Sequence, residues 1–191
     1  DFVSNRPPLA QRKFTSKAIE AAIVRIKKQI ANPELAWLFE NCFPNTLDTT
    51  VDFEIIDGKP DTYVITGDID AMWLRDSTAQ IWPYLLFVKE DPKLRELIKG
   101  VINRQTKCIL LDPYANAFYK DFNEISEWKN DMTKMQPGIH ERKWEIDSLC
   151  YPIRLAHEYW KNTGDISMFD ADWKKAMGLV LQTFKEQQRW D

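Results

Sequence analysis

Apolar residues recur three and four positions apart over six stretches of the chain, the spacing of amphipathic helices. Thr15 or Ser16 can cap the first stretch, and Pro33 suits the first turn of the second. Asn162 and Gly164 provide a stop signal after the fifth. The pattern therefore predicts helices at about 16–30, 33–41, 74–88, 92–111, 146–163 and 168–190.

Between Thr49 and Thr66 the helical period gives way to runs rich in β-branched and aromatic residues. The runs TVDFEIID and TYVIT flank the turn-forming letters GKPD, a pattern typical of a β-hairpin. The hairpin leads directly into the segment 66–80, TGDIDAMWLRDSTAQ, so we expect it to support that segment rigidly. Without βαβ alternation or a Gly-rich phosphate loop, the predicted fold is predominantly α with a small β-hairpin insertion.

The stretch 112–144 shows no sustained period and mixes aromatic with polar residues, as a long loop does. Loops of this length usually carry function or are disordered, and the aromatic side chains argue against disorder. Within it, the stretches 121–124 and 128–131 either rim a cleft or form solvated loop.

Composition excludes several classes of partner. The 26 basic and 29 acidic residues leave a net charge of −3, so neither nucleic acid nor an anionic membrane is an expected partner. No apolar run approaches the length of a membrane span, and no signal-peptide pattern opens the chain. The eight tryptophans mildly favour sugar binding, because an indole covers the apolar face of a pyranose, although we expect most of them to pack in the core.

Cysteines and histidines give no metal site. Cys42, Cys108 and Cys150 are too widely spaced for a zinc pattern or a disulfide framework, although one pair could still bridge in an oxidising compartment. His140 and His157 have no second ligand at metal spacing. We therefore expect neither a metal nor a cofactor.

The segment 66–80 concentrates groups suited to gripping a sugar. Three carboxylates, a guanidinium, a thioether and an indole fall within it: Asp68, Asp70, Met72, Trp73, Arg75 and Asp76. Carboxylates accept from vicinal hydroxyls, the guanidinium donates through a planar fork, and the indole stacks on C–H faces. The structural alternative is that Asp68 or Asp70 caps a helix starting near Ala71, while Arg75 pairs with Asp76 or a distant acid.

A second acidic pair opens the helix that follows the long loop. Glu145 and Asp147 alternate with apolar neighbours, so both can point into one space. Paired carboxyl groups are what glycosidic cleavage needs, one as acid and one as base or nucleophile. The alternative is that Asp147 caps the helix and Glu145 is merely exposed.

At these residues the chain resembles glycoside hydrolase family 125, the metal-independent exo-α-1,6-mannosidases. The resemblance rests on RPPLAQRKFTS, TGDIDAMWLRDSTAQIWPYL and KWEIDSLCYPIRLAHEYWK, and covers nearly the whole chain. It implies an (α/α)6 barrel and hydrolysis with inversion. It also implies that the terminal mannose of an oligosaccharide is bound by Asp70, Met72, Trp73, Arg75, Asp76, Glu145 and Asp147.

The resemblance places the catalytic acid and base after Asp191, so no catalytic residue is assigned within 1–191. We expect residues 1–191 to be the N-terminal part of a single (α/α)6 catalytic domain, incomplete here, whose activity requires the C-terminal half. Two alternatives stay open: a carbohydrate-binding helical domain without catalysis, and an (α/α)-barrel hydrolase with another sugar specificity. A periplasmic or secreted location is favoured over a cytoplasmic one.

Overall fold

The computed structural model describes residues 2–188, in which the α-helix is the main regular structure. The helices are α1 (Lys17–Lys27), α2 (Pro33–Cys42), α3 (Leu74–Ile81), α4 (Pro92–Leu111), α5 (Ile146–Thr163) and α6 (Ala171–Gln187). All six predicted helices are confirmed, in the predicted order and with ends shifted by a few residues. Trp190, where the last was expected to end, lies outside the described residues.

The helix ends follow local capping chemistry. The Ser16 hydroxyl accepts the Ile19 N–H at the start of α1, and Asp91 accepts two N–H groups at the start of α4. Helix α5 ends at Gly164, whose φ of 69° is left-handed and suits glycine. Helix α3 continues from Trp82 to Phe87 as a 3-10 helix, since Pro83 lacks the N–H that an α-helix would use.

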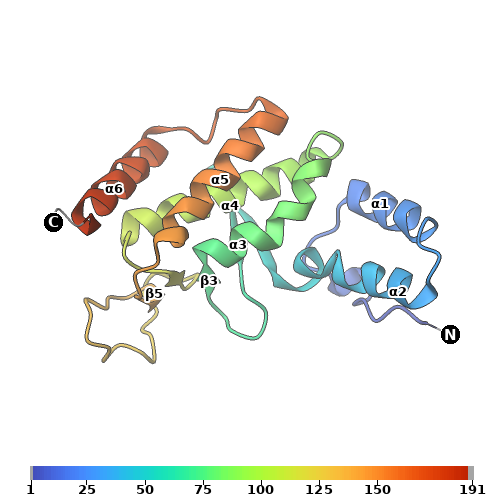
Figure 1. Cartoon of the computed structure of the whole chain (residues 1–191), viewed down its shortest axis with the longest axis horizontal. Helices are drawn as coiled ribbons and strands as arrows, with labels where there is room; N and C mark the ends of the chain where they lie inside the picture. The colour runs from blue at the N-terminus through green and yellow to red at the C-terminus, as the bar shows by residue number, and fades with distance from the viewer. Residues whose placement is uncertain (1, 189–191) are drawn as a thin grey trace.

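Helices α3 and α5 lie side by side, with α4 packed against α5 and α6, while α1 and α2 pair at the opposite end from α6 (Figure 1). The loop between β2 (Lys59–Val64) and β3 (Met72–Trp73) projects on the side where α3 and α5 begin. The loop at 121–138 projects on the same side. One side of the molecule thus carries both long loops and two helix starts.

The predicted hairpin consists of β1 (Val51–Ile56) and β2, paired antiparallel. Its turn is Asp57–Gly58, with φ angles of 51° and 74°, so the expectation of a turn at GKPD needs correction. Two-residue hairpin turns require positive φ at both positions, which Asp-Gly supplies. Pro60 lies within β2 instead, where a two-stranded sheet tolerates its missing N–H.

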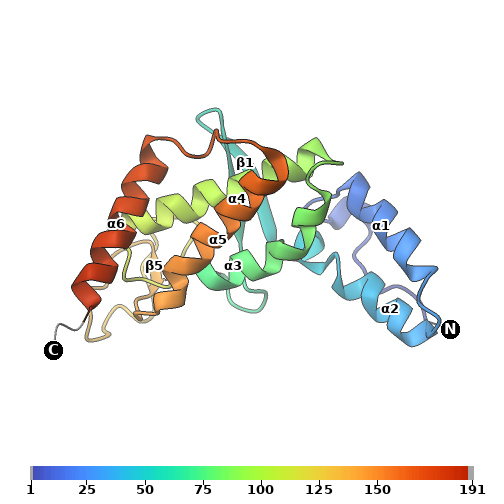
Figure 2. The ribbon, with the colours of Figure 1, turned by 45° about the horizontal axis from the view of Figure 1, so that its top comes forward.

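The hairpin lies across α4 (Figure 2), and the backbone of β2 packs directly against that helix. A Cβ built on Gly100 of α4 would lie 2.3 Å from Oγ1 of Thr62. The Thr62 hydroxyl donates to the Leu97 carbonyl at 2.7 Å. Beside it, the buried carboxylate of Asp61 accepts from Arg104 at 2.7 Å, so polar and steric contacts together fix the hairpin on the helix.

A second small sheet joins the 66–80 segment to two strands in the stretch 112–144 that was predicted as loop. Strands β3, β4 (Ala117–Phe118) and β5 (Ile139–Glu141) pair antiparallel in the order β3-β4-β5. Strands of two or three residues are too short to show an alternating period, which is why the sequence did not predict them.

Tryptophan burial is lower than expected. None of the seven tryptophans within 2–188 is fully buried, and Trp128 and Trp160 are largely exposed, so the expectation that most are core residues needs correction. Trp82, Trp144 and Trp173 pack against the core from its edge, which leaves the polar indole edge near solvent. All three cysteines are free.

Arg6 anchors the segment that precedes α1 to the rest of the chain. Its guanidinium donates to Asp48 at 2.8 Å and to Glu20 at 2.6 Å, and its side chain is only 6% exposed. The hydrogen bond from Arg6 lowers the pKa of Glu20 below its ordinary value of 4.5, although partial burial opposes the shift. Glu20 therefore stabilises the folded chain only while it is ionised.

This contact predicts a pH-dependent loss of stability. Because the folded-state pKa of Glu20 is lowered, its stabilisation is fully present above about pH 4.5 and is lost as the pH falls through the folded-state pKa. Urea unfolding between pH 3 and 7 should show Glu20→Gln less stable than wild type at pH 7, with the difference shrinking below pH 4.5. A difference that stays constant down to pH 3 contradicts the assignment, and Glu127→Gln, at an exposed loop position, is the matched control.

Candidate functional site

The β3-β4-β5 sheet sets the starts of α3 and α5 next to each other. Helix α3 begins directly after β3, and α5 begins a few residues after β5. Buried Asn116 joins the two starts: its carbonyl accepts the Leu74 N–H at 3.2 Å, and its Oδ1 accepts the Lys143 N–H at 3.0 Å. Its Nδ2 donates to Glu141 at 2.9 Å. Asn116 therefore holds the start of α3 through its main chain, and the segment before α5 through its buried amide side chain.

Arg75, on the first turn of α3, gathers three carboxylates at this junction. Its Nη1 lies 2.6 Å from Oε2 of Glu145 and 3.5 Å from Oδ2 of Asp147, while its Nη2 lies 3.5 Å from Oδ2 of Asp76. The four side chains are between 32% and 46% exposed, so a ligand can reach them. The structure brings Glu145 and Asp147 together with Arg75 and Asp76, and we call these four residues the Arg75 cluster.

The capping alternatives are wrong for both helices. Helix α3 begins at Leu74 rather than near Ala71, and Asp68 and Asp70 cap nothing. At α5 the N-cap position is taken by Glu145, whose carboxylate accepts from Arg75 and from the Ser148 hydroxyl. The ion-pair alternative for Arg75 is confirmed.

The electrostatics of the Arg75 cluster favour a ligand rich in hydroxyl groups. Partial burial alone would lower the pKa of Arg75, but the hydrogen bond and the charge of Glu145, with Asp76 and Asp147, outweigh it and raise that pKa. One cation faces three anions, so carboxylate oxygens outnumber protein donors. Oδ2 of Asp76 is buried with no hydrogen-bond partner, because its 3.5 Å approach to Arg75 is too long for one.

Trp73 lies at the edge of an aromatic group that the sequence did not predict. Its ring is 5.3 Å from that of His140, whose Nδ1 lies 2.8 Å from the Tyr119 hydroxyl. His140 is buried in β5. The sequence analysis considered His140 only as a metal ligand and excluded that role, and the GIHE run around it is too short to reveal a strand.

Two predicted site residues lie elsewhere. Met72 is fully buried in the core, so its expected contact with a sugar needs correction: on β3 its side chain faces inward while that of Trp73 faces outward. Asp70 is not among the ion pairs of Arg75, and together with Asp68 it lines a separate pocket.

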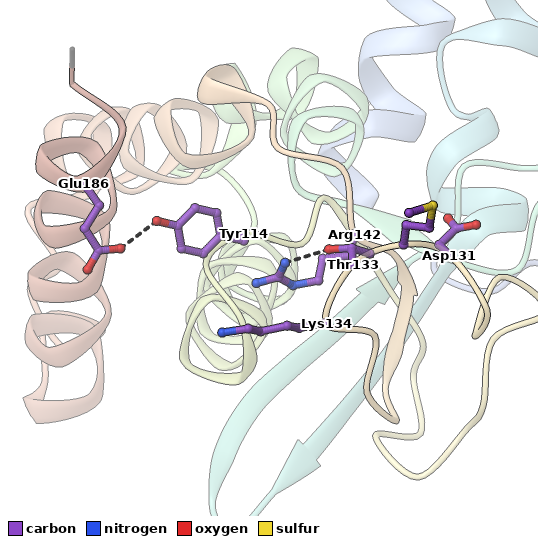
Figure 3. Close-up of a pocket in the computed structure, with 7 residues that line it drawn as sticks. Tyr114, Asp131, Thr133, Lys134, Arg142 and Glu186 are labelled. Atoms are coloured by element: carbon purple, nitrogen blue, oxygen red, sulfur yellow. Dashed lines mark hydrogen bonds between the residues drawn. The ribbon is translucent and has the colours of Figure 1, made fainter.

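A further pocket of about 760 Å³ lies between α6 and the long loop (Figure 3). Its lining includes Asp131, so the 128–131 stretch does border a hollow. The Tyr114 hydroxyl donates to Glu186 at 2.6 Å, which raises the pKa of Tyr114 and lowers that of Glu186. Arg142 donates to Thr133 at 2.8 Å. These groups satisfy one another, and none of the predicted binding residues lies here.

Among residues 2–188, no three or more His, Cys, Asp or Glu side chains come together in a way that could hold a metal ion. None of the helices in that range combines the length and apolar character needed to cross a membrane.

Comparison with known proteins relates this geometry to a family. The sequence model described as "Metal-independent alpha-mannosidase (GH125)" matches residues 32–191. The Meiotically up-regulated gene 157 protein of Schizosaccharomyces pombe is 40% identical over 190 residues, which are 95% of this chain and 37% of that protein.

A solved Streptococcus pneumoniae structure, a metal-independent α-mannosidase in a non-productive complex with α-1,6-mannobiose, is 42% identical with a TM-score of 0.80. The match covers 89% of this chain and 39% of that one. The chain thus spans less than two fifths of the length of either relative. The structural match confirms the predicted fold class, a predominantly α fold of the (α/α)6 type with a small hairpin. The chain belongs to the metal-independent α-mannosidases of glycoside hydrolase family 125.

Proposed function

We propose that the full-length protein containing this chain removes terminal α-1,6-linked mannose from oligosaccharides, with inversion and without a metal. The observation that carries the proposal is the Arg75 cluster, in which residues from two helix starts meet at an accessible place in a chain of this family. The mannobiose complex of the Streptococcus pneumoniae relative supports the choice of sugar and linkage.

Within this proposal the Arg75 cluster holds the terminal mannose. The guanidinium donates to ring hydroxyls, and the carboxylates of Asp76, Glu145 and Asp147 accept from them. The 39% exposed side chain of Asp76 and the half-buried ring of Trp73 complete the contacts. Together they replace the water that the sugar loses and fix its ring for attack.

Cleavage itself needs an acid and a base about 6.5–9.5 Å apart, with a water between the base and the anomeric carbon. Carboxyl groups can perform both proton transfers, so the reaction requires no metal. We assign neither role within residues 2–188 and propose that both lie beyond Asp191. A periplasmic or secreted location also stays a prediction.

The test is to incubate the full-length protein with α-1,6-mannobiose and follow the products by proton NMR. We expect mannose release with the β anomer appearing first, unaffected by EDTA, and much slower cleavage of the α-1,2 and α-1,3 isomers. First appearance of the α anomer contradicts inversion. Binding without release favours a carbohydrate-binding domain, and preference for another disaccharide favours a different hydrolase specificity.

A further inference from the structure

The first half of the TGDIDAMWLRD motif lines a pocket to which the second half, with Arg75, does not contribute. This pocket, of about 360 Å³, lies between the 67–70 loop, the base of the hairpin and Lys120. Its lining includes Lys13, Asp52, Tyr63, Asp68, Asp70 and Lys120. Neither the Arg75 cluster nor the proposed function accounts for these residues, and we call the hollow the loop pocket.

The loop that forms one wall is held in a defined shape. The Thr66 N–H donates to the Ala71 carbonyl at 3.2 Å, and the Thr66 hydroxyl donates to the Ile69 carbonyl at 3.2 Å, so the two ends of the loop are pinned together. Gly67 has a φ of 132°, which other residues rarely adopt. Asp68 and Asp70 both line the pocket, while Ile69 between them is exposed. The backbone therefore presents these two carboxylates on the same side.

Several charged groups in the loop pocket are free to bind a ligand. Lys120 pairs with Asp52 and Glu54, at 2.5 and 3.0 Å. Within residues 2–188, Asp68, Asp70 and Lys13 have no ion-pair partner within 4.0 Å, in contrast to the Arg75 cluster. Tyr63 also lines the pocket, but its hydroxyl already donates a hydrogen bond to the Phe118 carbonyl at 3.2 Å. The Lys13 ammonium thus remains as a donor and the carboxylates of Asp68 and Asp70 as acceptors, next to the aromatic ring of Tyr63.

The ligand that fits this chemistry is neutral and rich in hydroxyl groups. Three carboxylates and two ammonium groups line the loop pocket, so its charges nearly balance and favour neither a strong anion nor a strong cation. The volume lies at the lower end of the range for small-molecule sites. Vicinal hydroxyls can donate to the free carboxylates and accept from the free ammonium.

The loop pocket is also close to the Arg75 cluster. Asp70 and Arg75 are five positions apart in the sequence, so their Cα atoms are at most about 17 Å apart even for a fully extended chain. A short oligosaccharide can bridge that distance. We propose that the loop pocket is a second sugar subsite, which binds the residues that follow the terminal mannose; this inference rests on the proposed function.

The test compares substrates with and without those following sugars in the full-length protein. α-1,6-Mannotriose carries them, whereas α-mannosyl fluoride has a single sugar. We expect Lys13→Met to raise KM for mannotriose about tenfold, the effect of losing one or two hydrogen bonds to a ligand, and to change kcat/KM for the fluoride less than about twofold. Asp68→Asn should raise the mannotriose KM similarly. Lys174→Met, an exposed lysine on α6, is the matched control.

Each outcome decides the inference. If the wild type cleaves both substrates and neither Lys13→Met nor Asp68→Asn changes KM for mannotriose, the second subsite is refuted while the proposed function stands. Equal losses on both substrates for Lys13→Met also refute it, because the effect would not depend on the additional sugars. If the wild type cleaves neither substrate, the proposed function fails and this inference fails with it.

Discussion

Replacing Arg75 by methionine is expected to lower kcat/KM of the full-length protein on α-1,6-mannobiose by about 100-fold, with little change in stability. Without the guanidinium, Asp76, Glu145 and Asp147 face one another uncompensated, and the donor fork for sugar hydroxyls is gone. Truncating one partner of a charge pair that is buried at an interface costs about 2–5 kcal/mol, equivalent to a loss of roughly 30-fold or more, and a bound mannose would bury the Arg75 cluster in this way. Steady-state kinetics and thermal unfolding of the same preparation measure both effects.

The same experiment separates a binding role from a structural one. Ion pairs as exposed as these contribute only about 0–1 kcal/mol to stability. If Arg75 had only a structural role, Arg75→Met would therefore change kcat/KM very little. A large drop in melting temperature with unchanged sugar affinity would contradict the prediction. Arg75→Lys keeps the charge but loses the planar fork and should be intermediate. Arg25→Met, on the exposed side of α1, controls for the loss of one positive charge.

The helices were predictable because the signals that define them are local. A capping hydroxyl at Ser16 or a left-handed Gly164 acts within one turn of its own helix, so the sequence contains the whole cause. The hairpin was predictable for the same reason, apart from its turn. GKPD has the composition of a turn, but the positive φ angles of Asp57 and Gly58 decided the register.

The arrangement of the site was less predictable because it depends on contacts between distant residues. Asn116 joins Leu74 to Lys143 through a sheet whose strands are too short to leave a pattern. The alternation of polar and apolar residues correctly placed the Glu145 and Asp147 side chains on the same side of the chain. Such a pattern does not reveal which distant residues that side contacts. For the same reason Asp70 was expected beside Arg75 and instead lines the loop pocket.

The hairpin that supports the site packs on Gly100, and Gly100→Ala is expected to lower the free energy of unfolding by about 1–2 kcal/mol. The new methyl group would lie 2.3 Å from Oγ1 of Thr62 and 3.0 Å from its backbone nitrogen. The Thr62 side chain cannot swing away without losing its hydrogen bond to the Leu97 carbonyl, and the backbone of β2 cannot move without shifting the hairpin. Overpacking of this kind typically costs about 1–3 kcal/mol, more than the gain in helix propensity of up to about 1 kcal/mol.

A second glycine in mid-helix provides the matched control. A Cβ on Gly178 of α6 would meet no atom within 4 Å, so Gly178→Ala should stabilise the chain by about 0.5–1 kcal/mol through helix propensity alone. Urea unfolding of the two variants should therefore give shifts of opposite sign. Adding Thr62→Ala to Gly100→Ala should recover only part of the loss, because the contact with the backbone nitrogen remains. Similar shifts for both glycine variants would show that β2 yields easily, and the hairpin would then be a poor support for the 66–71 loop and its two carboxylates.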